Sequence, residues 1–345
     1  MFIPSPAQKT TVAIDKPPAS LYAQSMRKTV CILLAFSLLL GLCACGEPKE
    51  DTPRQAGGLH IVTTIFPLYD WVKHVVGEGD ARITMLLDTG VDLHSFQPTA
   101  RDILQITTCD VFLYVGGESD SWVADALQEA QNENMLALNL LSELGDAAKA
   151  EELAEGMEGE PEEAALDEHI WLSLKNAACL VDRIAQALSE LDPAGASQYA
   201  ANAAAYVQKL NALDARYEQT VAQASVRTLL FGDRFPFRYL TDDYGLAYYA
   251  AFSGCSAETE ASFETVAFLA GKADELRLPA VLMIEGGDGR IAQTIVNTTQ
   301  TKDQTILTLN SLQSVTAKDV QNGADYLAIM EENLSVLQAA LTGKG

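Results

Sequence analysis

The stretch Ala196–Ala224, ASQYAANAAAYVQKLNALDARYEQTVAQA, contains neither glycine nor proline and is rich in alanine, the residue with the highest helix propensity. We therefore expect one uninterrupted helix, which at about 1.5 Å of rise per residue is on the order of 40 Å long. A helix of that length is enough to cross two lobes. Residues 192–224, which open with Asp-Pro, are thus expected to be a stiff linking helix between two lobes.

On both sides of the linking helix, strand-like apolar segments alternate with helix-like segments. Strands are expected near 59–64, 82–87, 110–115, 227–231, 247–252, 280–285 and 305–309. Helices are expected near 68–76, 99–107, 174–191, 236–244, 263–276, 289–298 and 319–341. This alternation predicts an α/β fold in which each lobe is a parallel sheet flanked by helices. The lobes are expected at 59–191 and 225–345, and the long rigid spine helix should let them hinge only slightly.

Residues 141–168 interrupt the alternation. This segment contains eleven acidic side chains and a single lysine, with Gly156, Gly159 and Pro161 among them. Such a composition buries too little apolar surface to offset the entropy of ordering, so it predicts a mobile, solvated acidic loop. Loose gathering of cations is the alternative role.

The N-terminal region has the pattern of an export signal. Arg27 and Lys28 precede an apolar run, residues 30–42, that is too short to span a bilayer and has the length of a signal-peptide core. The following Leu-Cys-Ala-Cys resembles the lipobox of bacterial lipoproteins, which implies a signal region at 1–44 and lipidation of Cys45. Residues 45–58 are polar and proline-bearing, as in a tether from the membrane. Met26 is the more ordinary start for such a signal.

The charge and the cysteines exclude several classes of protein. Residues 1–44 carry four basic groups and one acidic group, so the formal charge changes from -24 for the chain to -27 without them. A surface this acidic repels nucleic acid and attracts cations. Cys109, Cys179 and Cys255 are widely spaced, which fits neither a disulfide framework nor a paired-cysteine zinc site. We expect them to be small buried residues.

Two of the four histidines outside the signal region stand in unusual company. His94 lies in GVDLHSFQPTARD, between an expected strand and an expected helix, and His169 lies in DEHIWLSLKNA, also just before a helix. Loops that follow strands in open α/β sheets collect ligands. An imidazole whose second nitrogen is oriented by a nearby carboxylate is a good metal ligand. Taken alone, each histidine fits equally well as a capping or hydrogen-bonded surface residue.

Together the two segments resemble the signature segments of the zinc- and manganese-binding substrate receptors of bacterial ABC importers. The usual wording there is Gly-x-Asp-Pro-His and Asp-Pro-His-x-Trp-Leu-Asp-Pro-x-Asn-Ala; here Leu93 and Glu168 replace the prolines, and Ser-Leu replaces the second Asp-Pro. Further similarities are TIFPL at 64–68 and YLAIMEENL at 326–334, so the resemblance spans 59–341. It implies that His94 and His169 bind the metal.

The resemblance also implies ligands from the second lobe, where this sequence departs from the family. Asp233 in FGDRFPFRYL stands where a histidine or glutamate is usual; a helix cap, or an ion pair with a nearby arginine, is its alternative role. Asn310 occupies the position of the family's aspartate, and a neutral amide is a weak ligand. The Asn310 oxygen, water, Glu260 or Glu285 remain as the fourth ligand, although Glu285 fits equally well as a residue that binds loop amides.

The resemblance implies an extracytoplasmic, membrane-anchored and monomeric receptor that carries Zn(2+), or alternatively Mn(2+), to an ABC-type metal permease. A metal-dependent hydrolase is the first alternative, because two histidines and a carboxylate can activate water, but the chain has no HExxH motif. A surface adhesin on the same fold is the second. We expect a receptor and not an enzyme.

Overall fold

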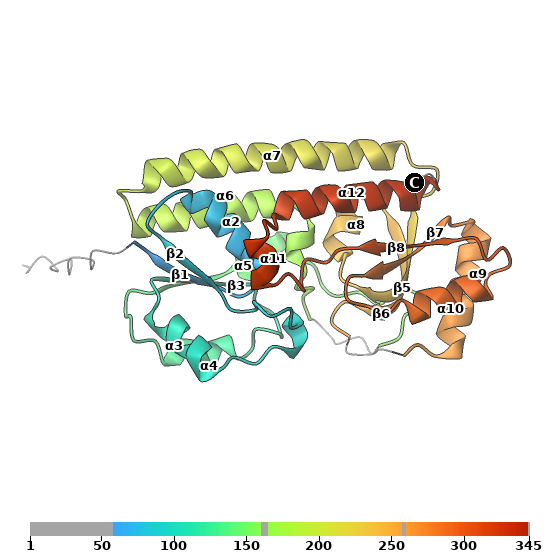
Figure 1. The fold of residues 1–345 in the computed structure, drawn as a ribbon, viewed down its shortest axis with the longest axis horizontal. Helices are drawn as coiled ribbons and strands as arrows, with labels where there is room; N and C mark the ends of the chain where they lie inside the picture. The colour runs from blue at the N-terminus through green and yellow to red at the C-terminus, as the bar shows by residue number, and fades with distance from the viewer. Residues whose placement is uncertain (1–57, 160–164, 257–259, 344–345) are drawn as a thin grey trace, which may run out of the picture. The chain divides into compact units, whose positions relative to one another are not determined.

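Two four-stranded parallel sheets dominate the computed structural model, which describes residues 58–159, 165–256 and 260–343 (Figure 1). The two-lobe α/β fold expected from the sequence is confirmed. The signal region, Cys45 and all but the last residue of the expected tether lie outside the described residues. In the part of the chain that is described, no helix has the length and apolar character needed to cross a bilayer.

The two sheets have the same strand order. The first contains β1 (His60–Thr63), β2 (Arg82–Met85), β3 (Val111–Tyr114) and β4 (Leu136–Asn139), in the order β2-β1-β3-β4. The second contains β5 (Thr228–Phe235), β6 (Ala247–Ser253), β7 (Ala280–Ile284) and β8 (Thr305–Leu309), in the order β6-β5-β7-β8. In each sheet the winding direction reverses beside the first strand. Loops diverge at the carboxyl ends of the strands at such a point, and ligands bind there.

Helices cover these sheets. In the first half they are α2 (Phe66–Val76), α3 (Ala100–Thr108), α4 (Val123–Gln128), α5 (Leu140–Glu143) and α6 (Leu174–Leu191). In the second half they are α8 (Arg238–Tyr244), α9 (Phe263–Leu276), α10 (Arg290–Thr298), α11 (Ala317–Gln321) and α12 (Tyr326–Thr342). Short 3-10 turns, η1 (Leu93–Ser95), η2 (Gly145–Ala147) and η3 (Ile170–Leu172), occupy the loops.

The linking helix is α7 (Ala196–Ala222), which packs against α6, α2 and α12 (Figure 1). Its buried side chains recur every three or four residues and so form one face: Tyr199, Ala203, Tyr206, Leu210, Leu213, Tyr217 and Val221. The fully buried Tyr217 donates a hydrogen bond of 2.6 Å to the carbonyl oxygen of Met330 in α12. A single unbroken helix thus contacts elements of both halves of the chain.

Two elements were not expected from the sequence, and one expected helix was wrong. The edge strand β4 and helix α4 were not expected, because 116–140 contain no sustained apolar period. The single helix expected at 319–341 is two helices, α11 and α12. Gly323 has a φ of 96°, which a helix interior excludes, and Asp325 then caps α12 by accepting a hydrogen bond of 2.9 Å from the amide of Ala328.

The described flanks of the acidic segment are packed rather than free, which corrects the expectation of a mobile loop for these residues. Ala150 pairs with Leu166, and Glu158 pairs with Phe252 of β6. The amide of Lys149 donates a hydrogen bond of 3.0 Å to the hydroxyl of Tyr239 in α8. Composition alone missed this, because the contacts come from the second half of the chain.

Candidate metal centre

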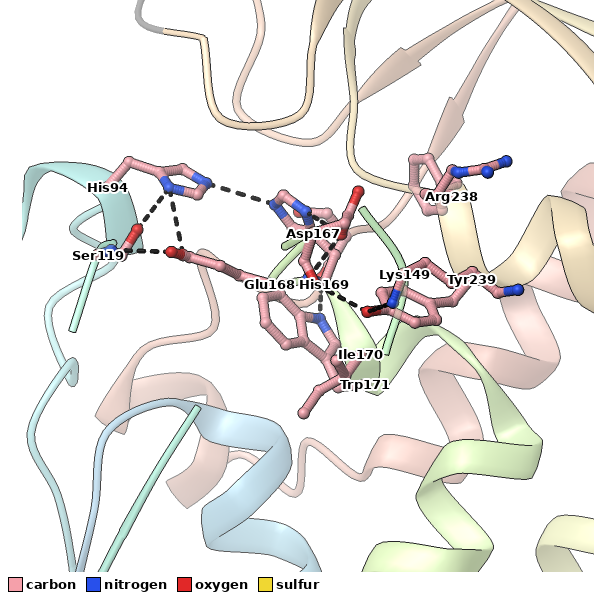
Figure 2. A network of polar contacts seen from close by, with 12 residues as sticks. His94, Ser119, Lys149, Asp167, Glu168, His169, Ile170, Trp171, Arg238 and Tyr239 are labelled. Carbon is pink, nitrogen blue, oxygen red and sulfur yellow. Dashed lines mark hydrogen bonds and ion pairs between the residues drawn. The ribbon is translucent and has the colours of Figure 1, made fainter. Parts of the chain in front are cut away.

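The imidazole rings of His94 and His169 point their Nε2 atoms toward one another, as Figure 2 shows. Their Nε2 atoms lie 3.3 Å apart, although the residues are 75 positions apart in the sequence. Two imidazoles bound to one tetrahedral zinc, with Zn–N bonds of about 2.05 Å, place their nitrogens roughly 3.3 Å apart. The separation therefore matches that of two ligands of a single metal ion.

Short polar turns fix both histidines. His94 lies in η1, where Asp92 accepts a hydrogen bond of 3.0 Å from the amide of His94. His169 lies directly before η3, and Asp167 accepts a hydrogen bond of 2.8 Å from its amide. In each case an aspartate two residues earlier forms an Asx-type turn, so the local sequence itself orients the histidine.

The second nitrogen of each ring also has a partner (Figure 2). His169 Nδ1 lies 3.0 Å from Asp167 Oδ1, and His94 Nδ1 lies 2.7 Å from Ser119 Oγ and 3.7 Å from Glu168 Oε2. Ser119 is itself held, because its amide donates to Glu168 Oε1 over 2.8 Å. With Nδ1 as the donor in both rings, each Nε2 lone pair is free to bind a cation.

Burial sets the charge of this centre. Burial, together with the neighbouring His169, lowers the pKa of His94 to about 4. Burial also raises the pKa of Glu168, and it raises the pKa of Asp120, whose Oδ2 accepts the amide of Gly116, to about 7. His94 is thus neutral at pH 7, which is the form that binds a metal.

A cysteine that was not expected to bind the metal completes this cluster. Cys255 follows β6, and its Sγ lies within 4.8 Å of one ring nitrogen from each of His94 and His169. Burial raises the pKa of the Cys255 thiol, so the group stays protonated until a cation replaces the proton. Of the three cysteines expected to be buried, only Cys109 is; Cys179 is exposed and Cys255 is partly exposed. The sequence signal that could have identified Cys255 is its position just after the strand expected at 247–252.

The other residues expected to bind the metal are engaged elsewhere. Asp233 lies within β5 and accepts hydrogen bonds from the amides of Arg234 (2.8 Å) and Ile284 (3.2 Å). Glu285 accepts from both the amide (2.6 Å) and the hydroxyl (2.7 Å) of Ser311. Neither carboxylate belongs to the cluster formed by the two histidines and the cysteine among the described residues.

Glu260 is also outside that cluster among the described residues, and Asn310 has partners of its own. The side-chain oxygen of Asn310 accepts a hydrogen bond of 2.8 Å from the amide of Leu312, which has a φ of 61°. Its backbone exchanges two hydrogen bonds of 2.8 Å with the side chain of Asn333 in α12. These contacts stabilise the turn after β8.

A cleft of about 630 Å³ lies beside the turn that carries His94. Its lining comes from both halves of the chain and includes Asp92, Ser95, Asp233, Arg234 and Glu285. Arg234 crosses it, because its guanidinium lies 2.7 Å from Asp92 Oδ2. The same aspartate caps the turn of His94, so one carboxylate connects β5 to that turn.

A second cluster, of Asp70, His74 and Asp325, lies between α2 and the start of α12. His74 Nε2 is 3.4 Å from Asp70 Oδ2 and 3.3 Å from Asp325 Oδ2, and its ring stacks on Tyr206 of α7. Burial lowers the pKa of His74, but the two carboxylates outweigh it and raise the pKa to about 9. This histidine is therefore a cation that joins three helices.

The chain is similar to proteins that are named for zinc uptake and zinc binding. The family model "ZnuA: Zinc-uptake complex component A periplasmic" matches residues 61–340. The zinc-binding lipoprotein AdcA of Streptococcus pneumoniae serotype 4 is 30% identical over 92% of this chain, which spans only 62% of the length of AdcA. The high-affinity zinc uptake system protein ZnuA of Bacillus subtilis is 28% identical over 91% of this chain and 97% of its own.

Among solved structures, the Zn(II)-bound ZnuA-like domain of Streptococcus pneumoniae AdcA superposes with a TM-score of 0.65 at 29% identity. The match covers 83% of this chain and 99% of that domain. The two-lobe arrangement is therefore common to both.

Proposed function

The chain belongs to the family of zinc-uptake complex component A proteins, and from this premise we propose that it binds Zn(2+) and delivers it to an ABC-type permease. His94 and His169 are the proposed ligands. The observation that carries the proposal is the 3.3 Å separation of their Nε2 atoms. Both Nδ1 atoms are already held, so each ring presents a lone pair to one shared point.

Zinc is favoured over manganese because neutral imidazoles suit zinc, whereas Mn(2+) prefers oxygen ligands. The relatives named zinc-binding and zinc-uptake proteins support the same choice. Asp233 and Glu285 line the cleft, where we propose that their charge attracts cations. They are not proposed as direct ligands, because their oxygens already accept backbone or side-chain hydrogen bonds. Asn310 is proposed to stabilise its turn.

The same geometry favours a receptor over the metal-dependent hydrolase considered from the sequence. Among the described residues, the carboxylates nearest the two rings are Asp167 and Glu168, and these lie against the Nδ1 side. A hydrolase needs a base that faces an open position on the metal. The surface adhesin is not favoured by the family assignment.

We propose the lobes 59–191 and 225–345 as the two sides of the site, with the linking helix limiting closure. Release would then depend on loops more than on hinge motion. Asp92 accepts hydrogen bonds from both the His94 amide and the Arg234 guanidinium, so a permease that displaces the β5 end would pull on the His94 turn. Lipid attachment at Cys45, an extracytoplasmic location and a monomeric state complete the proposal.

The decisive experiment is a competitive titration of metal-free protein with Zn(2+) and Mn(2+), combined with metal analysis of the protein as purified. We expect one zinc ion per chain and at least a hundredfold preference for zinc. Equal affinity for the two metals would contradict the choice of zinc, and no tight binding of either would overturn the proposed function.

A further inference from the structure

Resting on the proposed function, we propose that Cys255 supplies a thiolate ligand from the second lobe and thereby makes the site select zinc over manganese. The inference depends on the position of one side chain. Cys255 Sγ and one nitrogen from each of His94 and His169 lie within 4.8 Å of one another. In a tetrahedral zinc site with a Zn–S bond of about 2.3 Å, sulfur and nitrogen lie roughly 3.6 Å apart. A movement of the partly exposed Cys255 side chain by about 1 Å brings the distances from sulfur to nitrogen from at most 4.8 Å to this value.

The backbone around Cys255 is built to bring it close to the histidines. The amide of Ser256 donates a hydrogen bond of 3.3 Å to the carbonyl oxygen of Ser253, so Gly254 and Cys255 form the centre of a tight turn after β6. A Cβ atom on Gly254 would lie only 2.8 Å from His169 Cε1. Glycine therefore permits a close approach that carries the next residue, Cys255, to the ring.

The carboxylates of the second lobe that were expected to bind the metal already accept hydrogen bonds. Asp233 accepts backbone hydrogen bonds through both carboxylate oxygens, and Glu285 holds Ser311 through both of its own. Cys255 shares a ligand-sized cluster with the two histidines within the ranges that the structure describes, and its thiol also interacts with the carboxylate of Glu151. A His-His-Cys set leaves one further position for water or for a carboxylate from the cleft.

The chemistry of sulfur gives the selectivity. Thiolate is a soft ligand that favours Zn(2+), Co(2+) and related ions, while Mn(2+) prefers oxygen. Binding replaces the thiol proton by the metal, and the proton leaves to solvent without any transfer of electrons. The proposal therefore ascribes zinc selectivity to one cysteine and not to the acidic residues of the cleft.

Cobalt substitution tests this directly, because a thiolate bound to Co(2+) produces an intense charge-transfer band in the near ultraviolet. We expect that band in the metal-free protein loaded with Co(2+), and its loss in Cys255→Ser. The matched control is Cys179→Ser, which changes an exposed cysteine in α6 and should keep the band. Circular dichroism and the melting temperature confirm that each variant is folded.

Affinity supplies the second readout. In Cys255→Ser we expect zinc affinity to fall at least tenfold and manganese affinity to change less than threefold. Cobalt that binds through the histidines but shows no charge-transfer band would overturn the role of Cys255 while leaving the proposed function intact. Failure of the unaltered protein to bind cobalt or zinc at all would instead overturn the proposed function.

Discussion

Gly254 tests how tightly the second lobe fixes the ring of His169, the proposed metal ligand. In Gly254→Ala the new Cβ lies 2.8 Å from His169 Cε1, 3.1 Å from His169 Nδ1 and 3.0 Å from the carbonyl oxygen of Phe235. Ordinary contact begins at 3.4 Å, so the ring must retreat by at least about 0.6 Å. His169 is fully buried and is held by Asp167, which leaves it little room to move without losing its orientation.

The size of the effect follows from the tolerance of a metal site. Ligand distances are held within about 0.2 Å, so a displacement three times larger breaks the arrangement. Loss of a group that orients a metal-bound histidine costs about 10–100-fold in affinity, or roughly 1.4–2.8 kcal/mol. Overpacking should also lower the free energy of unfolding by about 1–3 kcal/mol.

Isothermal titration with Zn(2+) and thermal unfolding of the metal-free protein measure the two effects of Gly254→Ala. Gly271→Ala is the control, because its Cβ meets nothing within 4 Å on helix α9 and should stabilise by up to about 1 kcal/mol. Its zinc affinity should equal that of the unaltered protein. Zinc affinity in Gly254→Ala within twofold of the unaltered protein would refute the claim that this turn fixes the ring.

Three further predictions concern contacts around the site and the second cluster. In His74→Gln we expect the free energy of unfolding to fall by about 1–2 kcal/mol below pH 6.5. The rise of the His74 pKa from 6.5 to about 9 sets an upper limit of roughly 3 kcal/mol, and the partial exposure of the side chain keeps the effect below that limit. Because the folded-state pKa is raised, this stabilisation is complete below pH 6.5 and is lost as the pH rises through 9, so urea unfolding that shows the same deficit at pH 6 and pH 10 would contradict it. Asp167→Asn keeps an acceptor for His169 but removes its charge, so equilibrium dialysis should show a loss of zinc affinity of about tenfold, smaller than that of Asp167→Ala; no loss in either would contradict the orienting role. Asn310→Asp keeps the acceptor for the Leu312 amide, and zinc affinity measured by chelator competition should stay within twofold; a tenfold gain would show that this side chain binds the metal.

Much of the fold follows from periodicity in the sequence. The long linking helix and α6 lack internal breakers, and the buried strands β3 and β7 are continuous apolar runs, so local patterns place them within a few residues. The edge strand β4 is short and only partly buried, and a pattern of this kind does not stand out from a loop. The break before α12 depended on the backbone of Gly323, which a helical apolar pattern conceals.

For the site, too, the parts that depend on local contacts could be predicted and the parts that depend on distant contacts could not. The turns that carry His94 and His169 could be predicted, because their aspartates lie two residues away in the sequence. The second-lobe contribution could not, because it depends on which side chain the sheet brings opposite the rings. Asp233 lies in a strand that continues past a register shift after Phe231, and its carboxylate binds backbone amides. Cys255 instead follows the neighbouring strand.

The central claim is that one metal ion binds where the two imidazoles meet, and zinc titration of a double variant tests it most directly. Metal-free His94→Ala/His169→Ala protein should lose at least a thousandfold in zinc affinity while it keeps its fold by circular dichroism. His60→Gln is the matched control, since His60 lies in β1 against Thr84, outside the described metal clusters, and should bind zinc normally. A dissociation constant for zinc that stays below one micromolar in the folded double variant would contradict the account.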